Sequence, residues 1–103
     1  MKKAFMAIVE RADGWEGSRP PQEQDGFAGH AAYMHGLEDE GFIAMAGLLQ
    51  ETFDVLFILL ADSADEVRWR MAQDPWQQDG HTRLARVEEA QFRIGAPAGA
   101  APG

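Results

Sequence analysis

The chain contains no cysteine among its 103 residues. Disulfides, thiolate nucleophiles and cysteine metal sites are therefore excluded. Basic side chains are scarce, with 9 lysines and arginines against 17 aspartates and glutamates, and the formal net charge is −8. Because this charge repels phosphate backbones and anionic lipid surfaces, we expect neither nucleic acid nor a membrane as a partner.

Several functional motifs are also missing. There is no G-x-G-x-x-G and no P-loop, so we expect no nucleotide and no other cofactor. No serine lies in a G-x-S-x-G nucleophile elbow. The apolar run after the basic start is interrupted by Glu10 and Arg11 and is too short for a signal peptide or a membrane span. We therefore expect a cytoplasmic location.

The residues that are present have an ordinary globular composition, 46% hydrophobic and 25% charged. We expect a single domain over residues 1–95. Residues 96–103 consist of alanine, glycine and proline, and this composition predicts a disordered tail.

The hydropathy pattern predicts alternating strands and helices. Ser63, with Glu66 three residues later, is a capping box that opens the second helix, and Pro75 ends this helix at Asp74. The predicted strands cover residues 4–9, 42–49, 53–61 and 83–94, and the predicted helices cover 22–40 and about 63–74. The order strand, helix, strand, strand, helix, strand is typical of a ferredoxin-like α+β fold.

The first three predicted strands are apolar at both alternating sets of positions. In the first strand these sets are Phe5, Ala7 and Val9 on one face and Met6 and Ile8 on the other. Both helices of a ferredoxin-like fold cover the same face of the sheet, so the second face would be a large exposed apolar surface. A second copy packed sheet to sheet would cover it, and we therefore predict a homodimer.

His30 is the first candidate for chemistry. It shares the apolar stripe of the first predicted helix with Phe27 and Met34. Two interpretations are open. His30 is either a hydrogen-bonded core residue, or a general base or acid that a carboxylate orients in an apolar pocket.

The orienting carboxylate would have to come from elsewhere in the chain. Asp39 follows His30 by nine residues, which at roughly 100° per residue places it on the opposite helix face. Asp74 ends the second helix, which lies beside the first, so it is the better partner. The alternative is that Asp74 only stabilises its own turn through local hydrogen bonds.

Three other residues have less specific patterns. His35 lies on a different helix face from His30, without a set of carboxylates around it, so we expect no metal site. His81 follows Gly80 at the start of the last strand and is expected to be exposed. Trp15 lies in the glycine- and proline-rich loop 11–21, either as a rim residue or as part of a lid over a pocket.

Two segments carry an ordered set of short motifs: 30–33 (H-A-A-Y), 38–41 (E-D-E-G) and 46–47 (A-G) in the first, and 61–67 (A-D-S-A-D-E-V), 74–76 (D-P-W) and Gly80 in the second. Together they resemble the YciI-like (YCII-related) family. The first segment is similar to the histidine-led helix of that family and to the strand after it, and the second to its helix start, its Asp-Pro-aromatic stop and the glycine that follows. The resemblance covers roughly residues 3–94.

The resemblance implies a ferredoxin-like protomer, paired sheet to sheet as a dimeric α/β barrel. It also implies that His30 and Asp74 form the active-site pair. The pocket around them is expected to include Trp76, Trp15, Phe27 and Met34.

The chain departs from the family before the histidine. Residues 27–29 (F-A-G) stand where an arginine and a proline are common, and Leu48 stands where proline often follows the glycine. Arg19, in the first loop, is the candidate replacement for the missing cation.

Two functions follow from these patterns. The first is a small enzyme in which His30 moves a proton on a cyclic or aromatic molecule, as in lyase, isomerase or dehydrochlorinase chemistry. The second is a non-catalytic dimeric module that binds a small ligand or a protein. The fold alone does not choose between them.

Overall fold

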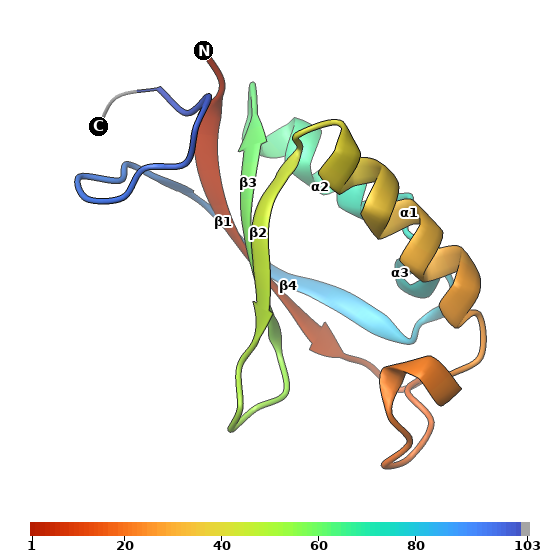
Figure 1. Cartoon of the computed structure of the whole chain (residues 1–103). Helices are drawn as coiled ribbons and strands as arrows, with labels where there is room; N and C mark the ends of the chain where they lie inside the picture. The colour runs from red at the N-terminus through yellow and green to blue at the C-terminus, as the bar shows by residue number, and fades with distance from the viewer. Residues whose placement is uncertain (102–103) are drawn as a thin grey trace.

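The structure is a computed structural model that describes residues 1–101. Its centre is one antiparallel sheet of four strands in the order β2-β3-β1-β4 (Figure 1). The strands are β1 (Lys3–Arg11), β2 (Ile43–Leu48), β3 (Val55–Ala61) and β4 (Thr82–Ala90). Each matches a predicted strand, although β4 ends at Ala90 and not at Ile94.

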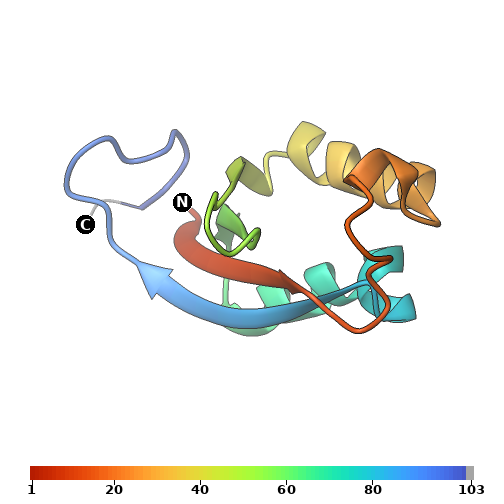
Figure 2. The ribbon, with the colours of Figure 1, turned by 90° about the horizontal axis from the view of Figure 1, so that it is seen from below.

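The helices lie on one side of this sheet, and the C-terminal segment lies on the other side (Figures 1 and 2). They are the 3-10 helix η1 (Pro21–Glu23) and the α-helices α1 (Phe27–Asp39), α2 (Ala64–Ala72) and α3 (Pro75–Asp79). The element order and the sheet order are compatible with a small ferredoxin-like α+β fold. Within residues 1–101, no helix combines the length and the apolar character that crossing a membrane requires.

The two longer helices begin and end for local reasons. The predicted helix 22–40 is interrupted because Gly26 has a left-handed φ of 77°, so α1 starts only at Phe27. At its other end, Gly41 has a φ of 81°, as expected of a glycine that terminates a helix. The predicted capping box of α2 is confirmed, because the Ser63 side chain accepts a hydrogen bond from the Glu66 backbone.

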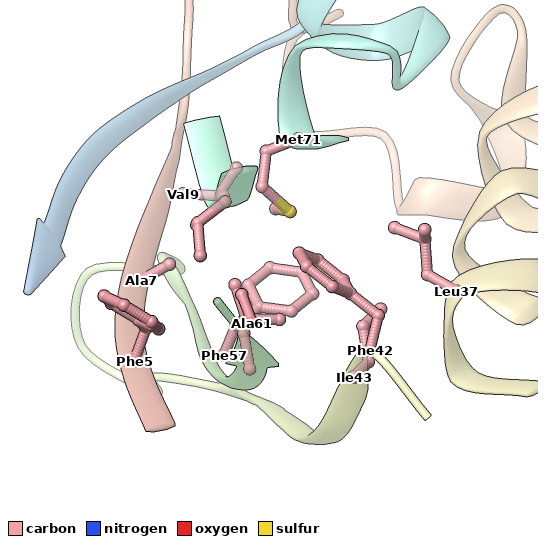
Figure 3. Close-up of a cluster of buried hydrophobic side chains, with 11 residues drawn as sticks. Phe5, Ala7, Val9, Leu37, Phe42, Ile43, Phe57, Ala61 and Met71 are labelled. Atoms are coloured by element: carbon pink, nitrogen blue, oxygen red, sulfur yellow. The ribbon is translucent and has the colours of Figure 1, made fainter. Parts of the chain in front are cut away.

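The hydrophobic core fills the space between the sheet and the helices. Alternate residues of β1 point into it, as expected for a strand that is covered on this face. Figure 3 shows Val9 and Met71 near the aromatic rings of Phe42 and Phe57, with Leu37 beyond them. The other buried members are Phe5, Ala7, Ile43, Leu59, Ala61 and Val67.

The opposite face of the sheet is also apolar at its centre. Ile8 pairs with Leu56, and Met6 pairs with Ile58, so these side chains adjoin across β1 and β3. All except the buried Ile58 are half-buried. None of the described helices covers this face, which is the surface on which the dimer prediction rests.

The C-terminal segment runs beside the start of β1. Ala100 forms a parallel bridge with Lys2 and is buried, and the Ala101 backbone N–H donates to the Lys2 carbonyl at 2.7 Å. The composition of residues 96–103 predicts disorder. Two residues of this segment, Ala100 and Ala101, make the contacts just described, and residues 102 and 103 lie outside the described part of the chain.

Candidate functional site

An Asp-Pro turn joins α2 to α3 and fixes the position of one carboxylate. Asp74 has extended backbone angles, φ −62° and ψ 126°, which the following Pro75 favours. Its Oδ1 accepts a hydrogen bond from the Trp76 backbone N–H at 3.0 Å, so Asp74 is the N-cap of α3. Pro75 suits the first helical position, where no backbone donor is needed. The predicted stop of α2 is thus also the start of a helix that the sequence did not predict.

His30 reaches this carboxylate from α1. Its Nδ1 lies 2.9 Å from Oδ1 and 3.0 Å from Oδ2 of Asp74. The Asp74 side chain is 3% exposed, and that of His30 is 21% exposed. Asp39 lies at the exposed end of α1, as the helical spacing predicts. The two side chains that the sequence pairs are therefore in direct contact.

This contact leaves the second nitrogen of His30 available. Asp74 accepts a hydrogen bond when Nδ1 carries the proton, and in neutral histidine the lone pair then lies on Nε2. Within residues 1–101, Nε2 has no hydrogen-bond partner. A histidine oriented in this way can accept a proton at Nε2 while the carboxylate stabilises the imidazolium that forms.

Trp76 fixes the plane of the imidazole. Its ring is stacked on His30, with centroids 3.9 Å apart and planes 11° from parallel. The indole is itself held, because its Nε1–H donates to the Asp25 carbonyl at 2.8 Å. Phe27 packs against the same indole at a centroid distance of 6.0 Å. Trp76 is therefore both a buried core residue and the support of His30.

A cavity of about 350 Å³ lies beside His30, Asp74 and Trp76. Between α1 and the helix-facing side of the sheet, its walls are apolar and include Met34, Ile43, Phe57 and Met71. Of the four pocket residues expected from the sequence, Trp76, Trp15 and Met34 line this cavity. Phe27 is not among the lining residues and lies behind Trp76. The volume suits a ligand of one or two rings.

Trp15 lines the cavity from the long loop after β1. Its ring meets Trp76 edge to face at 5.4 Å. Its Nε1–H is buried and has no hydrogen-bond partner among residues 1–101, so the ring is held by packing and by the loop backbone. The Gly14 N–H, next to it, donates to the Gly80 carbonyl at 2.9 Å. The side chain of Gln24, which is buried, accepts a bond from the Glu16 backbone at 2.7 Å.

His81 ties this loop to the turn before β4. Its Nδ1 lies 2.7 Å from Asp79 Oδ1, and its Nε2 lies 3.1 Å from Glu16 Oε1. The expectation that His81 is exposed is wrong, because it is 7% exposed and stacks on Trp76 at 5.5 Å. Burial opposes the charged ring, but the bonds to Glu16 and Asp79 outweigh it and raise the pKa of His81 above 6.5. Each ring nitrogen faces a carboxylate oxygen, so the protonated ring would donate to both Asp79 and Glu16.

The cation of the cavity is Arg11, at the end of β1. Its guanidinium carbon lies 4.3 Å from the ring centroid of Trp15 and 4.9 Å from that of Phe53. Arg19, the candidate from the sequence, is not among the lining residues and binds Glu16 at 3.0 Å on the surface. From the sequence, Arg11 is only an interruption of an apolar run, because one of the two rings that contact it, Phe53, lies in a turn far away in the chain.

Comparison with known proteins adds no assignment. No protein-family model matches the chain, and no curated protein sequence is significantly similar to it. Within residues 1–101, no group of three or more histidine, aspartate or glutamate side chains is arranged to hold a metal ion.

Proposed function

We propose that the chain is a small proton-transfer enzyme that acts on a cyclic or aromatic molecule bound in the cavity. The observation that carries this proposal is the pairing of His30 Nδ1 with the buried Asp74 carboxylate, 2.9 Å away, while Nε2 has no partner in the described chain. A general base needs this combination of a fixed tautomer and a free lone pair.

The reaction begins when Nε2 takes a proton from an acidic C–H of the ligand. Asp74 then stabilises the imidazolium, and the apolar walls keep water away from the carbanion or enolate. In an isomerisation, His30 returns the proton to another carbon. In an elimination, the electron pair of the broken C–H bond forms a C=C bond, and the leaving group departs with its own pair.

We also propose that the chain belongs to the YciI-like family and works as a homodimer with the sheet-to-sheet packing of a dimeric α/β barrel. The matching motifs of the two helices support the family. The apolar face formed by Met6, Ile8, Leu56 and Ile58 supports the dimer, because a second copy would remove it from water.

A non-catalytic dimeric module that binds a small ligand or a protein is the second candidate. One observation favours it. Asp74 Oδ1 also caps α3 through the Trp76 backbone at 3.0 Å, so the buried pair has a structural use that needs no chemistry. In this alternative, His30 only donates a hydrogen bond to the Asp74 carboxylate and packs against the indole of Trp76.

Isotope exchange separates these candidates without a known substrate. The protein is incubated in D₂O with a panel of lactones and cyclic or aromatic ketones, and loss of each acidic C–H signal is followed by NMR. We expect exchange in the unaltered protein and none in His30→Ala. Asp74→Asn should also lose it, because an amide keeps the helix cap but no longer fixes the tautomer.

Asp65→Asn is the matched control. Asp65 lies in the first turn of α2 with its side chain 99% exposed, so the same chemical change there should leave exchange intact. Ligand binding without protein-dependent exchange would favour the binding module. Undiminished exchange in folded His30→Ala would exclude His30 as the base.

A further inference from the structure

We propose that Arg11 selects anionic ligands, and that the cavity takes a small aromatic or cyclic carboxylate. The proposal rests on the proposed use of the cavity and adds the chemical class of its ligand. It begins from an imbalance among the charged side chains that line the cavity.

Two of the three carboxylates in the cavity lining are hydrogen-bonded to other side chains, and the third, Glu38, is exposed. Glu10 Oε1 accepts from Arg83, with a donor–acceptor distance of 2.9 Å at its Nε, and Asp74 binds His30. Glu38 lies 3.7 Å from His35. Arg11 has no carboxylate within 4.0 Å and donates no side-chain hydrogen bond to any residue in the described range 1–101. The lining therefore contains one cation whose hydrogen-bonding capacity is unused.

The surroundings of Arg11 hold it in place without neutralising it. Trp15 and Phe53 present their rings to the guanidinium, and aromatic rings attract a cation but accept none of its N–H groups in strong hydrogen bonds. Five donors in a planar fork remain for a ligand carboxylate, which arginine can bind through two parallel bonds.

The backbone at Phe53 supports the same conclusion. Phe53 has a φ of 63°, a left-handed conformation that is strained for a bulky aromatic residue. The turn between β2 and β3 holds it there, with the Phe53 N–H donating to the Leu49 carbonyl at 2.9 Å. The strain places an aromatic ring beside the cation, although the ring itself is 47% exposed.

The positions of the two functional groups define how such a ligand would lie. Trp15 contacts both Arg11 and Trp76, and Trp76 stacks on His30, so two indole rings connect the cation to the base. A flat ligand along these rings would place its carboxylate at Arg11 and an acidic C–H near Nε2 of His30. The cation would thus orient the ligand for proton transfer.

The test compares two probes of nearly equal shape, 2-naphthoate and 2-naphthamide, by isothermal titration calorimetry at neutral pH. We expect the unaltered protein to bind the carboxylate about tenfold or more tightly than the amide, as charge-assisted hydrogen bonds predict. Arg11→Gln should abolish this preference, and Arg11→Lys, which keeps the charge but not the fork, should retain part of it.

Arg68→Gln is the control because it changes the net charge by the same amount, from an exposed position on α2 that is not among the lining residues. It should keep the full preference. An equal preference in Arg11→Gln and Arg68→Gln, or no preference for the carboxylate in the unaltered protein, overturns the proposal. Neither result bears on His30, whose role is read from C–H exchange on uncharged compounds.

Discussion

The indole of Trp76 is stacked on the imidazole of His30 at 3.9 Å, and the carboxylate that binds this imidazole belongs to Asp74, two residues earlier. One short turn thus supplies both constraints on the histidine. Asp74 determines which nitrogen carries the proton, and Trp76 determines the plane of the ring. The sequence D-P-W combines the two because the proline holds the backbone between them in one conformation.

Removing the indole of Trp76 should destabilise the protein strongly, because this side chain is buried although it borders the cavity. Trp76 is 3% exposed, so we expect Trp76→Ala to lower the free energy of unfolding by about 3–5 kcal/mol. Trp69 is 65% exposed on α2, and Trp69→Ala should change it by less than about 0.5 kcal/mol. Urea unfolding followed by circular dichroism measures both. Equal effects would mean that Trp76 is not a packed support.

The two acceptor roles of Asp74 can be separated by two substitutions. Asp74→Ala removes both the cap of α3 and the partner of His30, and should destabilise the protein by about 1–3 kcal/mol. Asp74→Asn keeps a capping oxygen and should cost less. Chemical unfolding of the two variants gives the comparison. An asparagine variant that is as unstable as the alanine variant would contradict a separate role in helix capping.

Docking of the loop around Trp15 should depend on pH through His81 and Glu16. The folded pKa of His81 is raised above 6.5, because its bonds to Glu16 and Asp79 outweigh the effect of burial. Its contribution is therefore complete below pH 6.5 and is lost as the pH rises through the raised value. The pKa of Glu16 is lowered from 4.5 by the Asp25 backbone N–H, the His81 bond and the Arg19 charge, so its contribution is lost as the pH falls through the lowered value.

The loop should therefore be held best between pH 4.5 and 6.5. Hydrogen exchange of the Gly14 amide, which donates to Gly80, reports the docking directly. After correction for intrinsic exchange rates, protection should fall on the alkaline side in the unaltered protein. His81→Gln should remove this alkaline loss. Constant protection from about pH 5.5 to 8.5 would show that the His81 charge does not hold the loop.

A close backbone approach at Gly14 gives a second, pH-independent way to release the loop. A Cβ at this position would lie 2.7 Å from the Gly80 carbonyl oxygen. Gly14→Ala must therefore displace either the loop or the backbone at Gly80. We expect faster exchange in the loop and weaker ligand binding in the cavity. Gly36→Ala is the matched control, because nothing lies within 4 Å of its Cβ and alanine favours the helix by roughly 1 kcal/mol.

The proposed dimer predicts the mass in solution and the effect of a charge on the apolar face. Light scattering at micromolar concentration should give a dimer of the 11.4 kDa chain. Leu56→Asp should yield a monomer or an unfolded chain, because it places a carboxylate in the centre of the face that the proposed dimer would bury. A monomer mass for the unaltered protein would contradict sheet-to-sheet pairing.

The parts of the fold that could be predicted are those with local signals. The capping box of α2 lies within four residues, and the alternation in β1 repeats over a whole strand. Helix α3 was missed because five residues are too few to show helical periodicity. The burial of His81 depends on Glu16, 65 residues away in the sequence, and no local pattern reports that contact. The contact between Arg11 and Phe53 also joins residues that are far apart in the sequence, so no local pattern predicts it.

Because Pro75 belongs to the backbone that both ends α2 and starts α3, the direction of the Asp74 side chain is decided when the protein folds. A ligand entering the cavity meets a histidine and a carboxylate that are already aligned, and no conformational entropy has to be lost to align them at that moment. The site therefore combines two parts with different supports: a turn whose proline fixes the carboxylate beside His30, and a loop held over long sequence distances by its bonds to Gly80 and His81.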